Sequence, residues 1–220
     1  MTERNGLEIG YNLRNLPMQK KIMKKIVLLI AMLLLGAGIA SAQKEIGAGY
    51  GNSTLLFVER SGGATVNYKT PYTGAYLTFT GQLAELYPDI TLRSGVLLSY
   101  GTYKDSEELD KEAYLTVPID IRASTVMGKA TFYCGLGPRL SYGLSSTISA
   151  SSGGASIDLY DSSSLDYARF DVMFGFDIGV FFNETIGINL GLDRGLVKRF
   201  KEGNVSGTRD WLSAGLVLQF

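Results

Sequence analysis

Apolar and polar residues alternate along eight stretches of the chain after residue 43, and the last stretch shows the pattern most clearly. In Thr208–Phe220 every second residue counted back from Phe220 is apolar, whereas the residues between them are small or mixed. Side chains of a strand point alternately to its two faces, so the pattern predicts a strand with one apolar face. A buried edge strand of a soluble sheet would show the same alternation. The other seven stretches are Glu45–Gly51, Gly74–Gln82, Ile90–Tyr103, Glu112–Arg122, Ala130–Gly143, Ala168–Phe182 and Thr185–Leu196.

Segments rich in Gly, Ser, Asn, Asp and Lys separate these stretches, and their lengths alternate. No stretch after residue 43 combines helical length with a 3.6-residue period. Long loops on one side and short turns on the side of both termini are typical of membrane β-barrels. The expected long loops lie near 52–73, 104–111, 144–167 and 197–207, and the expected short turns near 83–89, 123–129 and 183–184.

The composition of the second strand face distinguishes a membrane barrel from a soluble sheet. In a soluble sandwich that face would be rich in Lys and Glu. Here it holds Gly, Ser, Thr, Tyr and a few Asp and Arg, with almost no Lys. Small side chains suit a crowded interior, and the long apolar face suits lipid. We therefore predict an all-β fold, an eight-stranded antiparallel transmembrane β-barrel. A soluble periplasmic barrel that binds a small apolar ligand is the alternative.

The N-terminal region has the three parts of a secretory signal peptide. Lysines follow Met18, residues 26–40 are apolar, and Ala40-Ser41-Ala42 is a small-residue cleavage site. The apolar run is shorter than the roughly 20 residues that a transmembrane helix needs. We expect 1–17 to be an over-extended start, 18–42 a signal peptide and 43–220 the barrel domain. Together with the barrel pattern, export by this route predicts a place in the outer membrane of a Gram-negative bacterium.

Charge and residue usage exclude several functions. Residues 1–42 hold six of the 21 basic residues and two of the 21 acidic ones, which leaves the rest with a net charge of −4 and no basis for nucleic-acid binding. The chain has no histidine, so the Ser-His arrangements of barrel hydrolases are excluded. Its single cysteine, Cys134, falls on the apolar face without a base. We expect no enzyme activity, no cofactor and no metal site.

Four segments carry a resemblance to a known family. They are the motifs Tyr114–Arg122, Tyr133–Leu140 and Arg169–Gly179 and the terminal Phe220. Over most of residues 43–220 the chain resembles the porin-family, PorT-like outer-membrane β-barrel proteins of Bacteroidetes-type bacteria. Pro118 lies in the middle of a predicted strand, where the missing N–H of a proline is normally tolerated only at bulges or edges. The family shares this mid-strand proline. "Porin" is here a family label and does not indicate a pore.

Side chains alternate between the outer and inner faces of each predicted strand, and this alternation places a set of charged side chains inside the barrel. The interior of an eight-stranded barrel is just wide enough for side chains to fill, and Tyr76, Tyr114, Tyr133 and Met173 share it. Charges in such a space should pair, because an unpaired buried ion costs several kcal/mol. We therefore expect an arginine–carboxylate network that closes the lumen. Its members are Glu45, Arg93, Asp120, Arg122, Arg139, Asp171, Asp177 and Asp193.

These features predict a non-enzymatic barrel that acts through its extracellular loops or as a structural component of the envelope. A narrow or gated channel is the alternative. The expected partners are outer-membrane lipid, an unknown extracellular partner, and the barrel-insertion machinery. The terminal Phe220 resembles the signal that this machinery recognises, and the last strand must close against the first.

Overall fold

The computed structural model describes residues 43–61, 64–105, 108–150, 156–161, 167–202 and 205–220. The expected start segment 1–17 and signal peptide 18–42 lie outside these residues. The described residues form ten β-strands and no helix. The strands are β1 (Lys44–Ser61), β2 (Ala64–Tyr87), β3 (Ile90–Lys104), β4 (Glu108–Met127), β5 (Ala130–Ala150), β6 (Ser156–Asp158), β7 (Phe170–Phe181), β8 (Ile186–Gly195), β9 (Phe200–Glu202) and β10 (Val205–Gln219).

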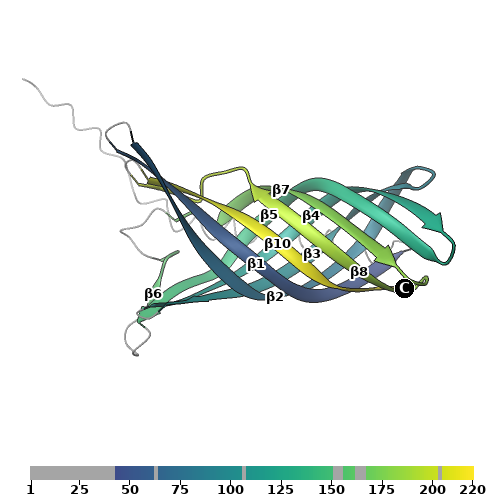
Figure 1. Ribbon diagram of the computed structural model, residues 1–220, viewed down its shortest axis with the longest axis horizontal. Helices are drawn as coiled ribbons and strands as arrows, with labels where there is room; N and C mark the ends of the chain where they lie inside the picture. Colours follow the sequence, from purple (N-terminus) through teal and green to yellow (C-terminus); the bar gives the residue numbers. More distant parts are fainter. Residues whose placement is uncertain (1–42, 62–63, 106–107, 151–155, 162–166, 203–204) are drawn as a thin grey trace, which may run out of the picture.

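Eight of these strands close into a ring. Each pairs antiparallel with its neighbours in the order β1-β2-β3-β4-β5-β7-β8-β10, and β10 pairs back to β1 from Glu45↔Gln219 to Glu59↔Val205. Figure 1 shows the dark blue β1 beside the yellow β10 along this seam. The short β6 and β9 pair with β5 and β10. The prediction of an eight-stranded antiparallel barrel is confirmed.

Among the described residues, no helix has both the length and the apolar character needed to cross a membrane.

One end of the barrel, called here the turn end, carries both Gln43 and Phe220 and the short connections. The backbones of Lys44 and Phe220 exchange hydrogen bonds there. Two of the three connections at this end have only two residues, and each contains a residue with positive φ, Asp89 at 66° and Gly128 at 67°. These turns are tighter than the expected 83–89 and 123–129, because the strands continue past the end of their apolar pattern.

At the opposite end, called here the loop end, the strands also run further than the sequence pattern predicts. The expected loop 52–73 is wrong: β1 continues to Ser61, and β2 begins at Ala64. The expected loop 144–167 is partly wrong, because β5 continues to Ala150 and β6 follows. Residues 65–69 are exposed on both strand faces. Because both faces of the strand meet solvent here, polar and apolar residues need not alternate, and the sequence pattern no longer identifies a strand. The β1–β2 hairpin projects furthest at this end (Figure 1).

The two faces of the barrel wall differ in composition. Apolar side chains stand outward and exposed along the ring, for example Leu77 at 52%, Phe176 at 45% and Leu216 at 63%. The inward side chains are buried and include polar and charged residues. A soluble ligand-binding barrel has the opposite distribution, whereas an apolar outer band around a polar interior is that of a membrane-spanning barrel.

Aromatic side chains occupy the interior where the wall carries glycine. A Cβ atom added to Gly51 would collide with the ring of Trp211, and one added to Gly49 would come within 2.8 Å of the Tyr76 ring. The inward glycines of β1 therefore leave room for large side chains from other strands. Trp211 and Tyr76 lie edge to face, with ring centroids 6.5 Å apart.

Pro118 interrupts the ladder between β3 and β4. Residue pairs are missing between Ser94↔Ile119 and Leu97↔Thr116. The hydroxyl of Ser94 donates to the carbonyl oxygen of Pro118 at 2.6 Å, so this buried acceptor is satisfied. An irregularity in the ladder is where a mid-strand proline is tolerated.

Candidate functional site

Three groups of charged side chains lie at successive heights in the lumen. The group nearest the turn end, called here the lower cluster, consists of Glu45, Arg93 and Arg122. Oxygen Oε1 of Glu45 accepts a hydrogen bond from Arg122 Nη1 at 2.7 Å. The same oxygen forms an ion pair with Arg93 Nη2 at 2.9 Å. The guanidinium of Arg122 also lies 4.1 Å from the centre of the Tyr133 ring. One carboxylate thus holds two arginines, and an aromatic face stabilises the second of them.

The middle cluster places one arginine among three carboxylates. Arg139 extends from β5 into the lumen, where its Nη1 contacts Asp120 of β4. Its Nη2 lies 2.9 Å from Asp177 of β7, and its Nε lies 3.3 Å from Asp193 of β8. All four side chains are at least nine-tenths buried. The fork of a guanidinium offers donors in several directions, so a single arginine can join four strands across the interior.

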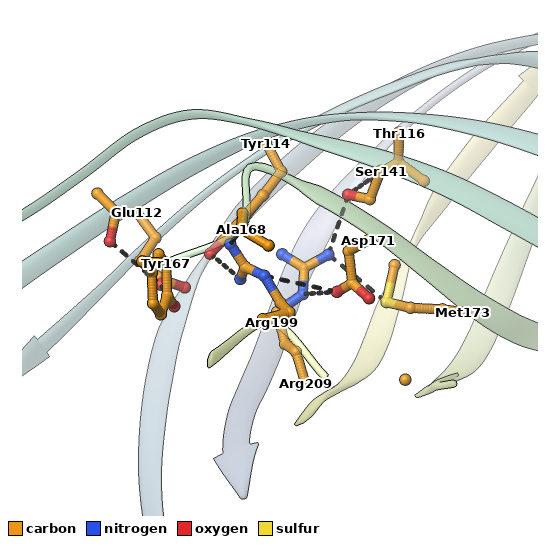
Figure 2. Close-up of polar contacts among 12 residues, drawn as sticks. Glu112, Tyr114, Thr116, Ser141, Tyr167, Ala168, Asp171, Met173, Arg199 and Arg209 are labelled. Atoms are coloured by element: carbon orange, nitrogen blue, oxygen red, sulfur yellow. Dashed lines mark hydrogen bonds and ion pairs between the residues drawn. The ribbon is translucent and has the colours of Figure 1, made fainter. Parts of the chain in front are cut away.

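The upper cluster lies closest to the loop end and is shown in Figure 2. Asp171 of β7 is fully buried between two arginines, with Arg199 Nε at 3.8 Å and Arg209 Nε at 3.6 Å. Arg199 donates to the hydroxyl of Tyr114 at 2.5 Å. Arg209 lies 3.7 Å from the centre of the same ring and donates to Ser141 Oγ at 3.1 Å. Tyr114 is therefore contacted by both cations, one at its hydroxyl and one at its face.

Tyrosines from the loop end cover the upper cluster. The hydroxyl of Tyr160 accepts from Arg199 Nη2 at 2.7 Å, and the Tyr160 and Tyr167 rings pack with centroids 5.4 Å apart. Tyr167 donates to Glu112 Oε1 at 3.0 Å. Burial raises the pKa of the Tyr167 hydroxyl well above its usual value, so it remains a protonated donor to this carboxylate.

A separate contact lies on the β2–β4 side of the loop end. Tyr72 donates to Asp110 Oδ2 at 3.3 Å. Burial raises the pKa of the Asp110 carboxyl, and the Tyr72 hydrogen bond partly offsets that effect. The pair ties the base of the β1–β2 hairpin to the start of β4.

The structure divides the eight residues named from the sequence. Seven of them form the lower and middle clusters, which lie next to each other along the barrel axis. The eighth, Asp171, contacts none of those seven and instead pairs with Arg199 and Arg209. The predicted companions Tyr76, Tyr114, Tyr133 and Met173 are all buried.

Sequence reasoning missed both arginines of the upper cluster. Arg209 lies two residues before Trp211, so the alternation that places Trp211 inside the barrel also predicts that Arg209 points into the lumen. Arg199 lies before β9, within the expected loop 197–207, and loop residues have no parity. Its long-range contacts with Tyr114 and Tyr160 follow from how the loop folds back over the lumen.

The described residues line a small hollow within the lumen and a larger one at its turn end. One, of about 70 Å³, lies between the lower and middle clusters and is lined by Glu45, Arg139 and Asp177 among others. The Nε1 of Trp211, which also lines it, has no hydrogen-bond partner within the described protein. The second, of about 420 Å³, lies at the turn end below Arg93 and Arg122 and reaches Asp89 and Glu184.

Catalytic and metal-binding arrangements are limited by the residues present. No group of three or more Cys, Asp or Glu side chains in the described ranges is arranged to hold a metal ion. Cys134 is exposed on the outer face. The chemistry that the three clusters provide is electrostatic and structural: each joins several strands by buried ion pairs.

Comparisons with known proteins show likeness in chain fold. No family model matches the sequence, and no curated protein matches it. Among solved structures, the chain is similar to Ail, the attachment invasion locus protein of Yersinia pestis, at 14% identity with a TM-score of 0.41, covering 82% of this chain and 99% of that one. It is similar to Neisserial surface protein A at 14% identity with a TM-score of 0.45, covering 80% and 97%. It is also similar to the outer membrane enzyme PagL at 8% identity with a TM-score of 0.37, covering 76% and 98%.

Proposed function

We propose that this protein is a PorT-like outer-membrane barrel, delivered by an N-terminal signal peptide, that conducts no solute and acts through its loop end outside the cell. The apolar outer band supports the membrane location. The absence of histidine excludes the Ser-His and Asp-His arrangements of barrel hydrolases. At the loop end the protein either binds an extracellular partner or serves as a structural component of the envelope.

The stacking of three buried clusters along one axis carries this proposal. Guanidinium groups reach across the interior at the lower, middle and upper heights, and each is held by carboxylates or tyrosines from other strands. A solute that moved along the axis would have to separate Arg139 from its carboxylates. Leaving one partner of such a buried pair without its counter-charge costs about 3–5 kcal/mol. The charged side chains therefore close the lumen and hold the strands together.

The loop end is the surface left for function. The turn end has two-residue turns and a mouth lined by Asp89, Glu184 and Gln219. The loop end carries the projecting β1–β2 hairpin and β6 (Figure 1), and β9 lies there too because it pairs with the start of β10. Residues on surface loops positioned by a rigid scaffold commonly carry binding functions.

Epitope insertion tests the location and orientation. One variant carries a short epitope after Asp105, in the β3–β4 connection at the loop end. A matched variant carries it after Gly128, in the β4–β5 turn. Antibody added to intact cells should bind the first variant only, and both should bind after the outer membrane is opened. Binding to neither variant in intact cells, with the protein recovered in the soluble fraction, would refute the proposal.

A narrow or gated channel is the second candidate, and the hollow of about 420 Å³ favours it. That hollow reaches from the turn end to Arg93 and Arg122, so part of the lumen is accessible from one side. A channel would further require the middle cluster to open. Single-channel recording separates the two functions.

A further inference from the structure

Part of β2 at the loop end has an unpaired edge. β2 pairs with β1 over its whole outer half, to Ser61↔Ala64. Its pairing with β3 begins only at Thr73↔Thr102, and β3 ends at Lys104. None of the described residues pairs with the other side of β2 from Thr65 to Pro71. We call this segment the β2 edge.

The register shows which backbone groups point outward from the β2 edge. The N–H of Gln82 donates to the carbonyl of Gln43, so Gln82 faces β1. In an antiparallel ladder the residues of a strand face its two neighbours alternately. The β1–β2 register has no shift, so the even-numbered residues of β2 face β1. The N–H and C=O groups of Thr65, Asn67 and Lys69 therefore face the open side.

Pro71 supports this assignment independently. It has an odd number, so the position where it lacks an N–H also faces the open side. Proline occurs in strands where the missing donor faces away from the ladder. Pro71 and Lys69 are residues of the kind that limit indiscriminate edge pairing. They lie at the end of the edge nearest the barrel, which leaves Thr65 and Asn67 open at the far end.

The side chains of the β2 edge suit an incoming strand. All five residues from Thr65 to Lys69 are exposed. Val66 at 45% and Tyr68 at 54% stand on the face that continues the barrel interior. β-branched and aromatic side chains of this kind are stabilised by cross-strand neighbours. Phe57 lies opposite Tyr68 on β1, whereas on the open side none of the described residues pairs with Tyr68.

We propose that the β2 edge binds an extended segment of a partner polypeptide outside the cell by strand addition. This inference rests on the proposed function, since it needs the loop end to face outward. The segment runs antiparallel to β2, in line with β3 and beyond its end. It places apolar side chains beside Val66 and Tyr68 and an acidic one beside Lys69. Main-chain bonds supply affinity and the alternate side chains supply selectivity.

A second copy of this chain fits the β2 edge less well. Two barrels in one membrane point the same way, so their β2 strands would meet in parallel. Parallel pairing is slightly less stable per residue than antiparallel pairing. A separate peptide segment can take the antiparallel direction without that restriction.

The test uses a defined peptide with the refolded full-length barrel in detergent micelles. The probe is fluorescein-labelled Thr-Val-Glu-Val-Thr-Tyr-Thr, whose Glu is placed opposite Lys69 in the antiparallel register. A control peptide has the same sequence with N-methyl groups on the Glu and on the middle one of its three Thr residues, which removes the two donors that lie opposite Lys69 and Asn67. Fluorescence anisotropy measures the Kd of each peptide.

The protein variants separate backbone pairing from side-chain contact. Asn67→Pro removes one edge donor and leaves the β1 ladder intact, whereas Asn67→Ala keeps that donor. We expect Asn67→Pro to weaken binding at least tenfold and Asn67→Ala to change it less than threefold. Lys69→Pro should act like Asn67→Pro and replaces it if that variant does not refold.

Three results would overturn the proposal. The first is that the wild-type barrel does not bind the probe. The second is that Asn67→Pro and Asn67→Ala give equal Kd values. The third is that the N-methylated peptide binds as tightly as the unmodified probe. A dimer that Asn67→Pro abolishes and that excludes the peptide would instead identify a second copy as the occupant. Because the assay uses refolded protein, its failure leaves the orientation measured by epitope insertion unaffected.

Discussion

Replacing Arg139 tests whether the lumen is held together by buried ion pairs. Its guanidinium contacts Asp120, Asp177 and Asp193, and its side chain is only 7% exposed. In Arg139→Ala three carboxylates lose their shared cation at once. Breaking one buried pair in this way costs about 3–5 kcal/mol. A buried carboxylate without a partner takes up a proton rather than remain charged, which keeps the loss near that range instead of a multiple of it.

Unfolding by guanidinium chloride in lipid vesicles measures this loss. The chain has one tryptophan, Trp211, which is 5% exposed in the lumen, so its emission reports exposure of the interior. Arg139→Met retains most of the side-chain volume and separates the lost charge from an empty cavity. Arg194→Ala is the matched control, because this arginine follows Asp193 on β8 but its side chain is exposed. The control should change stability by no more than about 0.5 kcal/mol.

A double-mutant cycle assigns the effect to a specific contact. Asp177→Asn in the wild-type and Arg139→Met backgrounds should give a coupling energy of about 0.5–3 kcal/mol, as residues in one network do. The reasoning is refuted if both Arg139 variants unfold within about 1 kcal/mol of the wild type, which is the range of exposed ion pairs.

Three further predictions follow from other parts of the chain. The mature protein should begin at Gln43, which intact-mass measurement of envelope-isolated protein checks; a mass that includes residues 18–42 would contradict it. Deleting Phe220 should reduce assembly into the membrane more than shortening the β5–β7 loop, and equal amounts of the Phe220 deletion and wild type in the membrane fraction would show that the residue is no signal. Cys134, the single cysteine, should react with a lipid-soluble maleimide but not with a charged one when the barrel is in vesicles; equal labelling would place this face in water.

The closed ring could be predicted from the sequence, because its evidence is periodic. Alternation along Thr208–Phe220 and the seven other stretches identifies strands wherever one face meets lipid and the other the lumen. The same signal disappears at Thr65–Lys69, where both faces are exposed. The sequence therefore predicts a loop where the structure has the outer halves of β1 and β2. The β2 edge, the feature that we propose binds a partner, lies in this part of the chain.

From the sequence one can predict which side chains of the candidate site point inward, but not which of them meet. Alternation places Glu45, Arg93 and Arg139 inside, but it carries no information on register between strands. Which arginine meets which acid depends on that register, and the division into three clusters follows from it. Arg199 enters the lumen from a connection and not from a strand, so its contact with Asp171 is a tertiary effect.

Single-channel recording of the wild-type barrel in planar bilayers tests the central claim, a lumen closed by three stacked clusters, most directly. A general porin inserted under the same conditions serves as the control for insertion and detection. We predict that the wild-type protein inserts, as shown by heat-modifiable mobility of the recovered protein, and gives no steady ion current. Steady, voltage-independent channels from wild-type protein would contradict the closed lumen and favour the transport function.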